Sequence, residues 1–325
     1  MHSRTAFRIA VAFLAVSWPV IGQWAAAQSC AQPVKIVVPF SPGTGMDILA
    51  RTLGPKLSQM WGQPVVIENK PGASGNLGTY LVVKAAPDGC TLMMGASTVV
   101  INPALYKDMP FNPLTDLAPV GLAANAPLLL VVNPKTGITT ARELVERSKE
   151  KPGTLNYGSP GIGTPHHMAM ELFKATSGAS LTHIPFSASG PAVTQLLGGE
   201  VPVMFLPVHV AIPYVKAGKL MALATGGARR TTMAPDVPTL GELGFRDADT
   251  DVWYAMWAPA GTPAAIVAKI DADMQKALAL PDVRGVIAGQ GMEVLTSSPA
   301  ELQTRMQADA ARWAQLVKRA GIQAE

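Results

Sequence analysis

Two loops rich in glycine, proline, serine and threonine are the parts of this sequence best suited to chemistry. The first, residues 39–45, follows a short β-branched run at residues 34–38 and precedes apolar residues of helical period. The second, residues 158–164, lies in the same way between an expected strand at residues 155–157 and an expected helix that begins at Pro165. In open α/β sheets, ligands bind at loops between the carboxyl end of a strand and the amino end of a helix. The sequence therefore predicts two ligand-facing loops.

The chemistry available to these loops is anion binding by the main chain. A helix amino terminus carries unpaired N–H donors and about half a positive charge. Neither of the segments around the two loops, residues 36–50 and 152–173, contains a lysine or an arginine. Recognition would rest on backbone amides, bound water and the hydroxyl groups of Ser41, Thr44, Ser159 and Thr164.

The energy of such a site can be compared with that of a metabolite complex. One helix terminus contributes about 0.3–2 kcal/mol, and each charge-assisted hydrogen bond contributes about 1.5–3 kcal/mol. Several together reach the roughly 8 kcal/mol of a micromolar complex. A metabolite carboxylate fits that scale. The alternative is that both loops are only tight turns and bind no ligand.

Other polar and aromatic residues near the loops allow more than one interpretation. Asp47 falls in the first turn of the expected helix, where a carboxylate is stabilising by itself; the functional alternative is a partner for a ligand ammonium. His167 and Glu171 have the i, i+4 spacing of a structural pair on one helix. Trp253 and Trp257 are expected in the core, with the lining of a cleft as the alternative. The sequence has no H-E-x-x-H motif, so we expect no metal site.

The elements that must position these residues alternate between strands and helices. This order predicts an α/β fold with a mainly parallel sheet and helices on both of its faces. Because 325 residues exceed the usual size of a single core, we expect two lobes. Lobe one is predicted as residues 28–124 plus 252–325, and lobe two as residues 125–251. The apolar segment 117–132 makes the first crossing, and the segment 251–258 returns and is followed by two helices.

The first 27 residues are expected to be a secretory signal. His2, Arg4 and Arg8 form a short basic stretch before an uncharged run that ends in three alanines, which suit signal peptidase. The alternatives are an uncleaved membrane anchor and lipid attachment at Cys30. We expect a cleaved signal and an exported protein.

Composition and charge exclude several other classes. Hydrophobic residues make up 48% of the chain and charged residues 15%, which argues against disorder. Removal of the signal takes away two of the 26 basic residues and none of the 22 acidic ones, which leaves a net charge of +2. No basic tract is present, so we expect no nucleic-acid partner. Cys30 and Cys90 are the only cysteines; both a single bridge and two unpaired thiols remain open.

An enzyme is the main alternative to a binding protein. Gly43-Thr44-Gly45 follows an expected strand as a dinucleotide-binding loop would, but Ile48 stands where the third glycine is needed. No G-x-S-x-G motif of a serine hydrolase is present. We predict a binding protein without a cofactor and without enzymatic activity. The alternative is a periplasmic α/β enzyme that acts on a carboxylate or a dinucleotide-linked substrate.

Several short strings of residues also carry a family resemblance. The string VPFSPG at residues 38–43, with Asp47 and Ala50-Arg51, closely resembles the opening of the Bug-type (TctC-like) receptors of tripartite tricarboxylate transporters. Further similar strings occur in order along the chain, at residues 68–75, 87–89, 161–164 with His167, 183–186, 218–220, 235–240 and 259–263. The resemblance covers essentially the whole chain after the signal.

The resemblance implies a periplasmic, monomeric Venus-flytrap protein of the type II-like kind, whose lobes close on a carboxylate partly through ordered waters. The implied ligands are di- and tricarboxylates, acidic amino acids or aromatic acids, and the implied partners are membrane transporter subunits or a sensor domain. The predicted ligand-binding residues are Phe40, Ser41, Gly43, Thr44, Asp47, Ala73, Ser97, Ser159, Gly163, Thr164, His167 and Phe186.

This sequence departs from the family pattern at three places. Cys90 replaces an expected tyrosine, Phe186 replaces a frequent tyrosine, and Leu206-Pro207 stands where an acidic or amide residue is common. The loss of that polar group predicts a more apolar ligand.

Overall fold

The structure, a computed structural model, describes residues 30–246, 248 and 250–322. The signal predicted at residues 1–27 lies outside the described residues. The strands are β1 (Val34–Val38), β2 (Val65–Asn69), β3 (Thr91–Ala96), β4 (Leu117–Val132), β5 (Asn156–Ser159), β6 (Thr182–Pro185), β7 (Val203–Pro207), β8 (Met221–Thr225), β9 (Asp251–Pro259) and β10 (Glu293–Val294).

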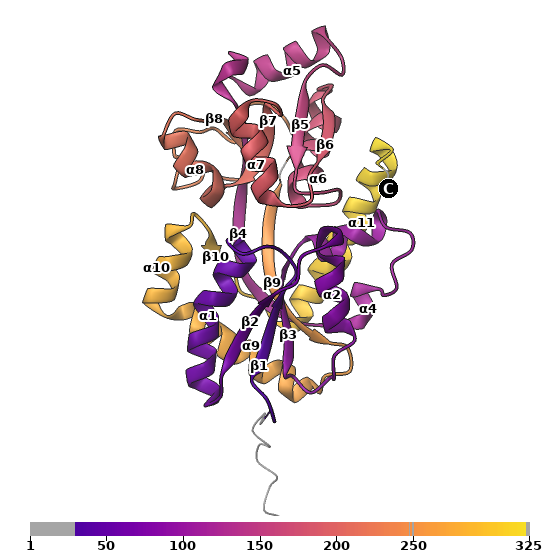
Figure 1. Ribbon diagram of the computed structural model, residues 1–325, viewed down its shortest axis with the longest axis vertical. Coiled ribbons are helices and arrows are strands. Elements are labelled where there is room, and N and C mark those ends of the chain that lie inside the picture. Colours follow the sequence, from indigo (N-terminus) through magenta and orange to yellow (C-terminus); the bar gives the residue numbers. More distant parts are fainter. Residues whose placement is uncertain (1–29, 247, 249, 323–325) are drawn as a thin grey trace, which may run out of the picture.

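The helices cover both faces of the sheet (Figure 1). The α-helices are α1 (Gly45–Trp61), α2 (Asn76–Val83), α3 (Thr98–Ile101), α4 (Pro113–Asp116), α5 (Ala141–Glu150), α6 (Pro165–Ser177), α7 (Ser189–Gly198), α8 (Val208–Lys216), α9 (Ala264–Ala279), α10 (Pro281–Gly289) and α11 (Pro299–Ala320). Three short 3-10 helices are η1 (Ala73–Gly75), η2 (Asn102–Ala104) and η3 (Pro134–Thr136).

The described strands form a mixed sheet in the order β2-β1-β3-β9-β4-β7-β5-β6, with β8 and β10 also paired to β4. The pairs β1–β2, β1–β3, β5–β6 and β5–β7 are parallel. The two long strands β4 and β9 run antiparallel to each other and to their other neighbours. The predicted α/β class is confirmed, but the sheet is mixed rather than mainly parallel because of these two strands.

The elements gather into two lobes that share β4. Residues 117–127 of this strand pair with β9, and residues 128–132 pair with β7 and β8. In Figure 1, β1–β3 and α1 belong to the lower group, and α5–α8 with β5–β8 form the upper group. We call the lower group lobe one and the upper group lobe two. Thirteen of the 16 residues of β4 are buried, because this strand lies in the cores of both lobes.

The path of β4 follows from its residues. Its β-branched and aliphatic residues suit a strand that is covered on both faces. A proline cannot donate to the ladder, and at Pro119 the pairing with β9 shifts register. Near the join between the lobes, Asn125 Nδ2 donates a hydrogen bond of 2.9 Å to Asp251 Oδ2 and connects the two crossing strands.

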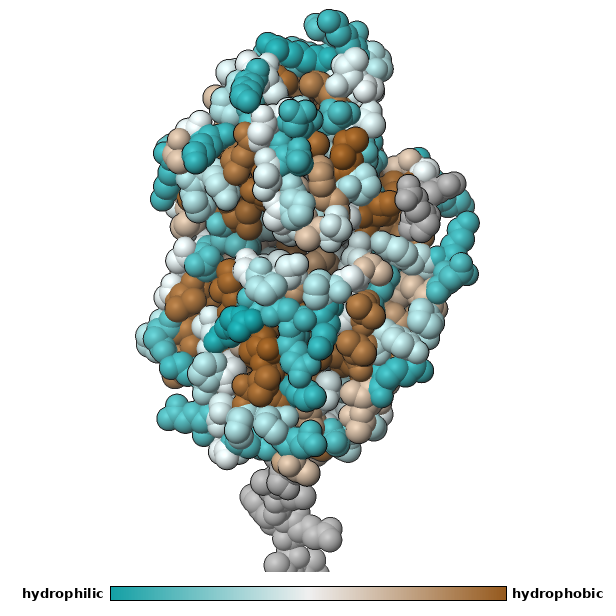
Figure 2. Space-filling view, in the orientation of Figure 1, coloured by the Kyte–Doolittle hydropathy of each residue, from teal (hydrophilic) through white to brown (hydrophobic). Residues whose placement is uncertain are grey.

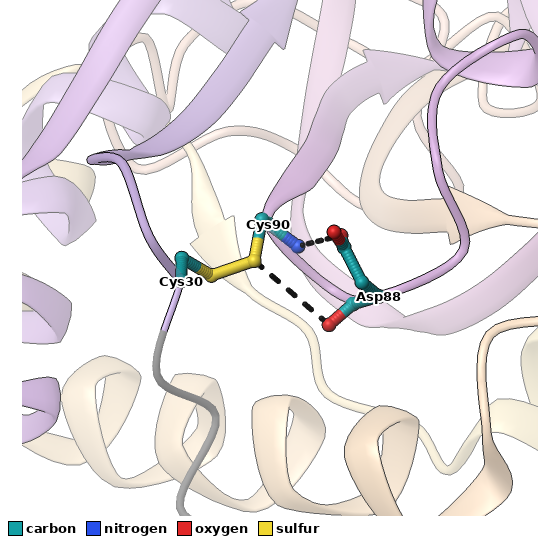
Figure 3. The surroundings of a disulfide bond; sticks show 3 residues. All are labelled: Cys30, Asp88 and Cys90. Atoms are coloured by element: carbon teal, nitrogen blue, oxygen red, sulfur yellow. Dashed lines mark hydrogen bonds between the residues drawn. A yellow bond between two sulfur atoms is a disulfide. The ribbon is translucent and has the colours of Figure 1, made fainter.

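Cys30 and Cys90 form a disulfide, with their Cα atoms 5.7 Å apart (Figure 3). This bond decides the question that the cysteine content left open. It joins the start of the described chain to the loop before β3, where Asp88 Oδ1 accepts a hydrogen bond of 2.8 Å from the Cys90 N–H. Because its sulfur is in the bridge, Cys30 has no free thiol for lipid attachment.

The part of the chain after β9 holds three helices, and the prediction of two was wrong. Leu280 has an extended backbone and separates α9 from α10, which begins at Pro281. The last helix, α11, starts with a capping box in which Ser298 Oγ accepts from the Glu301 N–H and the Glu301 carboxylate accepts from the Ser298 N–H. Within the described residues, no helix combines the length and the apolar character needed to cross a bilayer.

Candidate ligand-binding site

A cavity of about 380 Å³ lies between the two lobes. Figure 2 shows the surface hollowed at mid-height, where the two groups of elements meet. Lobe one contributes the loop before α1, the start of that helix, and residues of β3, α3 and β9. Lobe two contributes the second loop, the start of α6, the end of β7 and residues along α7 and α8. The lining residues are Phe40–Met46, Ala96, Thr98, Pro160, Thr164–His166, Ser189, Gly190, Val193, Thr194, Leu197, Leu206, Pro207, His209, Val210, Tyr214, Val252 and Tyr254.

The first loop is held in place by two side chains behind it. The buried Asp47 carboxylate accepts hydrogen bonds of 2.9 Å each from the Gly43 N–H, Arg51 Nε and Asn69 Nδ2. Asn69 Nδ2 also donates to the Phe40 carbonyl over 3.1 Å. Burial alone would raise the pKa of Asp47, but the hydrogen bonds outweigh it and hold this pKa below its usual value. Asp47 therefore shapes the loop and does not line the cavity.

The start of α1 points its free main-chain donors at the cavity. Thr44 is the N-cap residue; its side chain makes no cap bond, and its hydroxyl donates to the Ser41 carbonyl over 3.0 Å. The N–H groups of Gly45 and Met46 have no acceptor within their own helix. The Tyr254 ring lies so close to Gly45 that a side chain there would overlap it. Burial raises the pKa of Tyr254, so its hydroxyl stays protonated at neutral pH.

Three helices of lobe two also begin at the cavity without a side-chain cap. Their N-cap residues are Thr164 for α6, Ala188 for α7 and Pro207 for α8. Each terminus leaves N–H donors unpaired and carries partial positive charge. The main-chain dipoles of four helices, including α1, therefore favour negative charge in the cavity.

The second loop is closed by its own hydrogen bonds. Ser159 Oγ lies 2.7 Å from His183 Nε2 and accepts from the Gly161 N–H over 3.2 Å. The Gly163 N–H donates to His167 Nδ1 over 3.1 Å. Gly163 has a φ of +80°, which favours glycine at this turn. The Ser159 and His167 side chains thus brace the loop from behind.

The predicted pair of His167 and Glu171 is wrong. The Glu171 carboxylate accepts instead from the Tyr157 hydroxyl and from Lys174 Nζ, and His167 stacks on His183 with ring centroids 4.1 Å apart. The geometric reason is that the His167 ring turns toward the loop and the Gly163 N–H. Glu171 faces the strand β5.

The structure brings only some of the predicted ligand-binding residues to the cavity. Phe40, Ser41, Gly43, Thr44 and Thr164 line it. The others do not: Asp47 and His167 lie behind the loops, Ser159 and Gly163 belong to the second loop without lining the cavity, and Ala73, Ser97 and Phe186 also lie outside the lining. The tryptophans Trp253 and Trp257 are 1% and 0% exposed and lie in the core, as the preferred interpretation held.

Ala73 belongs to a segment where the lobes touch beside the cavity. The hydroxyl of the neighbouring Ser74 donates to the Ile162 carbonyl in the second loop over 2.6 Å. Tyr106 Oη donates to the same carbonyl over 3.2 Å. Ala73 and Ser74 both have positive φ, of 46° and 51°, which is uncommon outside glycine. This contact holds the second loop of lobe two against lobe one.

Two histidines in the lining were not among the predicted residues. His166 and His209 lie in the first turns of α6 and α8. Burial, and then the nearby His209, lower the pKa of His166 to about 3, and burial lowers that of His209 to about 4. Both imidazoles are therefore uncharged at neutral pH. The signal available in the sequence was weak, because adjacent histidines on a helix point to different sides and nothing selects His166 over its neighbour.

No group of side chains suited to a metal ion is found in the part of the chain that the structure describes. The lining contains no lysine, arginine, aspartate or glutamate among the described residues. The arrangement can therefore bind an anion by main-chain donors, hydroxyls and neutral imidazoles. It has no assembled nucleophile and base for catalysis within this lining.

The two lobes and the interlobe cavity define a solute-binding protein. Residues 49–322 match the family model of the tripartite tricarboxylate transporter family receptor, TctC, and the chain belongs to this family. It is 34% identical over 293 residues to protein BugT of Bordetella pertussis, with 90% of each chain covered. The family consists of receptors, which confirms the predicted resemblance and the prediction of a binding protein rather than an enzyme.

Two solved structures are similar to this protein at 32% identity. Rpa4515 of R. palustris, solved with adipate, has a TM-score of 0.85 over 90% of this chain and 98% of that one. MatC from Rhodopseudomonas palustris, solved with bound malate, has a TM-score of 0.81 over 88% of this chain and 99% of that one.

Proposed function

We propose that this protein captures a small carboxylate in the cavity between its lobes and presents it to a membrane transporter. The observation that carries the proposal is that four uncapped helix amino termini meet at a cavity without charged side chains in its described lining. Such termini stabilise anions. Both similar structures with a named ligand hold a carboxylate, adipate in one and malate in the other.

We expect one carboxylate of the ligand to lie against the first turn of α1. The N–H groups of Gly45 and Met46 would donate to it, and the hydroxyls of Ser41 and Tyr254 lie in the same lobe-one part of the lining. One helix terminus contributes about 0.3–2 kcal/mol, and each hydrogen bond to a charged group about 1.5–3 kcal/mol. A few such contacts account for micromolar binding, which requires about 8 kcal/mol.

The body of the ligand is expected to be apolar. Val193, Leu197, Leu206 and Val210 line the lobe-two part of the cavity. The volume of about 380 Å³ is at the small end of the range for small-molecule sites. Both observations support a short-chain or aromatic acid.

The location and the partners belong to the same proposal. The signal at residues 1–27 would be cleaved, and the mature protein would act in the periplasm as a monomer. Because the family is that of transporter receptors, we propose transporter subunits as the membrane partner, with a sensor domain as the alternative. We also propose the division into residues 28–124 plus 252–325 and residues 125–251, with β4 and β9 as the connections that bend when the lobes close.

A thermal-shift assay with purified residues 28–325 tests this function. A panel of mono-, di- and tricarboxylates, acidic amino acids and aromatic acids should contain at least one compound that raises the melting temperature. At 100 times its Kd a ligand stabilises by about 2.7 kcal/mol, which corresponds to several degrees in a protein of this size. If every acid left the melting temperature unchanged, the proposed function would be wrong.

A substitution in the first loop locates the site. Ser41→Trp should fill the lobe-one part of the cavity and abolish the stabilisation by the ligand, while the melting temperature without ligand stays nearly the same, because Ser41 is only half-buried. Ser41→Ala is the matched control, since it leaves the cavity open and should retain most of the response. Full binding by Ser41→Trp would place the ligand elsewhere.

A further inference from the structure

Two histidines in the lining have ring nitrogens that are buried but have no hydrogen-bond partner. In the described residues this holds for Nδ1 of His166 and for both ring nitrogens of His209. His166 comes from the first turn of α6 and His209 from the first turn of α8, so two different helices bring them to the same cavity. Buried polar atoms in native proteins are nearly always hydrogen-bonded. A ligand that comes within reach of these nitrogens would supply the hydrogen-bond partners that they lack.

Few other groups can influence the charge of these two rings. The only other titratable side chains in the described lining are Tyr214 of α8 and Tyr254 of β9. The remaining described histidines, His167 and His183, lie behind the second loop and bond to it. Glu171 and Lys174 of α6 act on that second pair of histidines. The pKa of His166 is lowered by burial and then by the neighbouring His209, and the pKa of His209 is lowered by burial alone, so no lysine, arginine or carboxylate contributes to either shift.

The charge balance of the cavity changes when an acid enters it. An acid with one carboxylate brings one negative charge, which the α1 terminus and its neighbours can stabilise. An acid with two carboxylates brings a second charge, for which lobe two offers only the partial positive charges of the α6, α7 and α8 termini and no cationic side chain in the described lining. An uncompensated buried charge is strongly unfavourable, and a group nearby that can titrate will change its protonation state instead.

We propose that His166 and His209 bind a second carboxylate of the ligand and take up one proton from solvent when they do so. This inference rests on the proposed function and concerns only how the second carboxylate would be bound. The proton adds to one imidazole nitrogen, which then donates to a carboxylate oxygen; no covalent bond between heavy atoms changes. One proton is taken up rather than two, because two imidazolium ions next to each other would repel.

The proposal fixes the direction of the pH dependence. A negative charge beside the rings raises their pKa in the complex above that in the free protein, so ligand affinity increases as the pH falls. When one full proton is taken up, the Kd falls about tenfold for each pH unit. The useful range is pH 8 to 6, in which both carboxylates of a simple diacid remain largely ionised.

Isothermal titration calorimetry measures this proton directly. Straight-chain diacids of four to nine carbons, adipate among them, are each compared with the monoacid of the same length, such as hexanoate. Each titration is repeated at pH 6 in two buffers of different ionisation enthalpy, which gives the number of protons bound. We expect close to one proton for the diacid that binds best and none for its monoacid. The diacid Kd should fall by up to tenfold from pH 7 to pH 6.

Variants connect the proton to the two rings. His166→Gln/His209→Gln keeps hydrogen-bonding side chains but removes both imidazoles, so the proton uptake and the pH dependence should disappear. His183→Gln is the matched control, because it removes a buried imidazole outside the lining; proton uptake by this variant should equal that of the wild type. The comparison of diacid with monoacid needs only the wild-type protein and holds even if a variant fails to fold.

The outcomes separate this inference from the proposed function. If no acid of either series or of the wider panel binds, the proposed function itself fails. If acids bind but the diacids take up no proton, or only monoacids bind, the function stands and this inference is wrong. The inference is also wrong if the double variant takes up the same proton as the wild type.

Discussion

Acidification from pH 7 to pH 5 should strongly destabilise this protein through four buried or half-buried histidines. Burial is the main cause that lowers the pKa of His166, His167 and His183 to about 3 and that of His209 to about 4. In the unfolded chain these groups have a pKa of about 6.5. Between the two values the unfolded state binds more protons, so the free energy of unfolding is largest above pH 6.5 and falls as the pH decreases.

The size of the effect follows from these pKa values. For one histidine the loss between pH 7 and pH 5 is about 2 kcal/mol, because the slope approaches 1.4 kcal/mol per pH unit below pH 6.5. The four described histidines together give an upper limit of about 8 kcal/mol. That limit is comparable to the whole stability of a typical protein, about 5–15 kcal/mol.

Urea denaturation of residues 28–325 at pH 7, 6 and 5 measures this loss. His209→Gln should reduce the difference between pH 7 and pH 5 by about 2 kcal/mol, the share of one histidine. Imidazole NMR signals of the folded protein should show no titration between pH 7 and pH 5. Signals that titrate near pH 6.5 in the folded state, or a free energy of unfolding that stays constant over this range, would refute the reasoning.

Three further substitutions, one of them with a control variant, test other features of the structure. Gly45→Ala places a methyl group against the buried tyrosine of β9. It should lower the free energy of unfolding, measured with urea, by about 1–3 kcal/mol and weaken ligand binding at least tenfold. Gly54→Ala, further along the same helix, is the control and should leave the affinity unchanged. Cys30→Ser removes the disulfide to Cys90, which closes a loop with a sequence separation of 60. It should lower the free energy of unfolding by up to about 4 kcal/mol, and chemical reduction of the wild-type disulfide should have the same effect. Ser74→Ala removes the hydrogen bond to Ile162 between the lobes and should weaken ligand binding about fivefold, close to 1 kcal/mol, in calorimetry; equal affinity would exclude a role in closure.

Much of the fold could be predicted because its strands are short apolar runs with clear ends. The β-branched run at Val34–Val38 and the break after it predict β1 and the start of α1, and the apolar segment Leu117–Val132, interpreted as a crossing between lobes, coincides with the strand β4. The direction of the strands could not be predicted, because apolar periodicity is the same for parallel and antiparallel pairs. The interruption at Leu280 was missed, because a single extended residue separates two helices of similar pattern.

The candidate site could be predicted at the level of loops but not of individual side chains. The two glycine-containing loops do border the cavity, since carboxyl ends of strands and amino ends of helices meet there. Which of two neighbouring residues faces the ligand depends on the rotation of a helix, and this set His166 apart from His167. His209 could not be found at all, because its position depends on the packing of α8 against β4, which is distant in the sequence.

A crystal structure of the protein with the acid that binds it best tests the central claim most directly. We expect a carboxylate of that acid within 2.7–3.2 Å of the main-chain N–H groups of Gly45 and Met46, with the remainder of the molecule between the lobes. A ligand whose carboxylate pairs with a lysine or arginine on the surface, while the space between α1 and α8 holds only water, would contradict it.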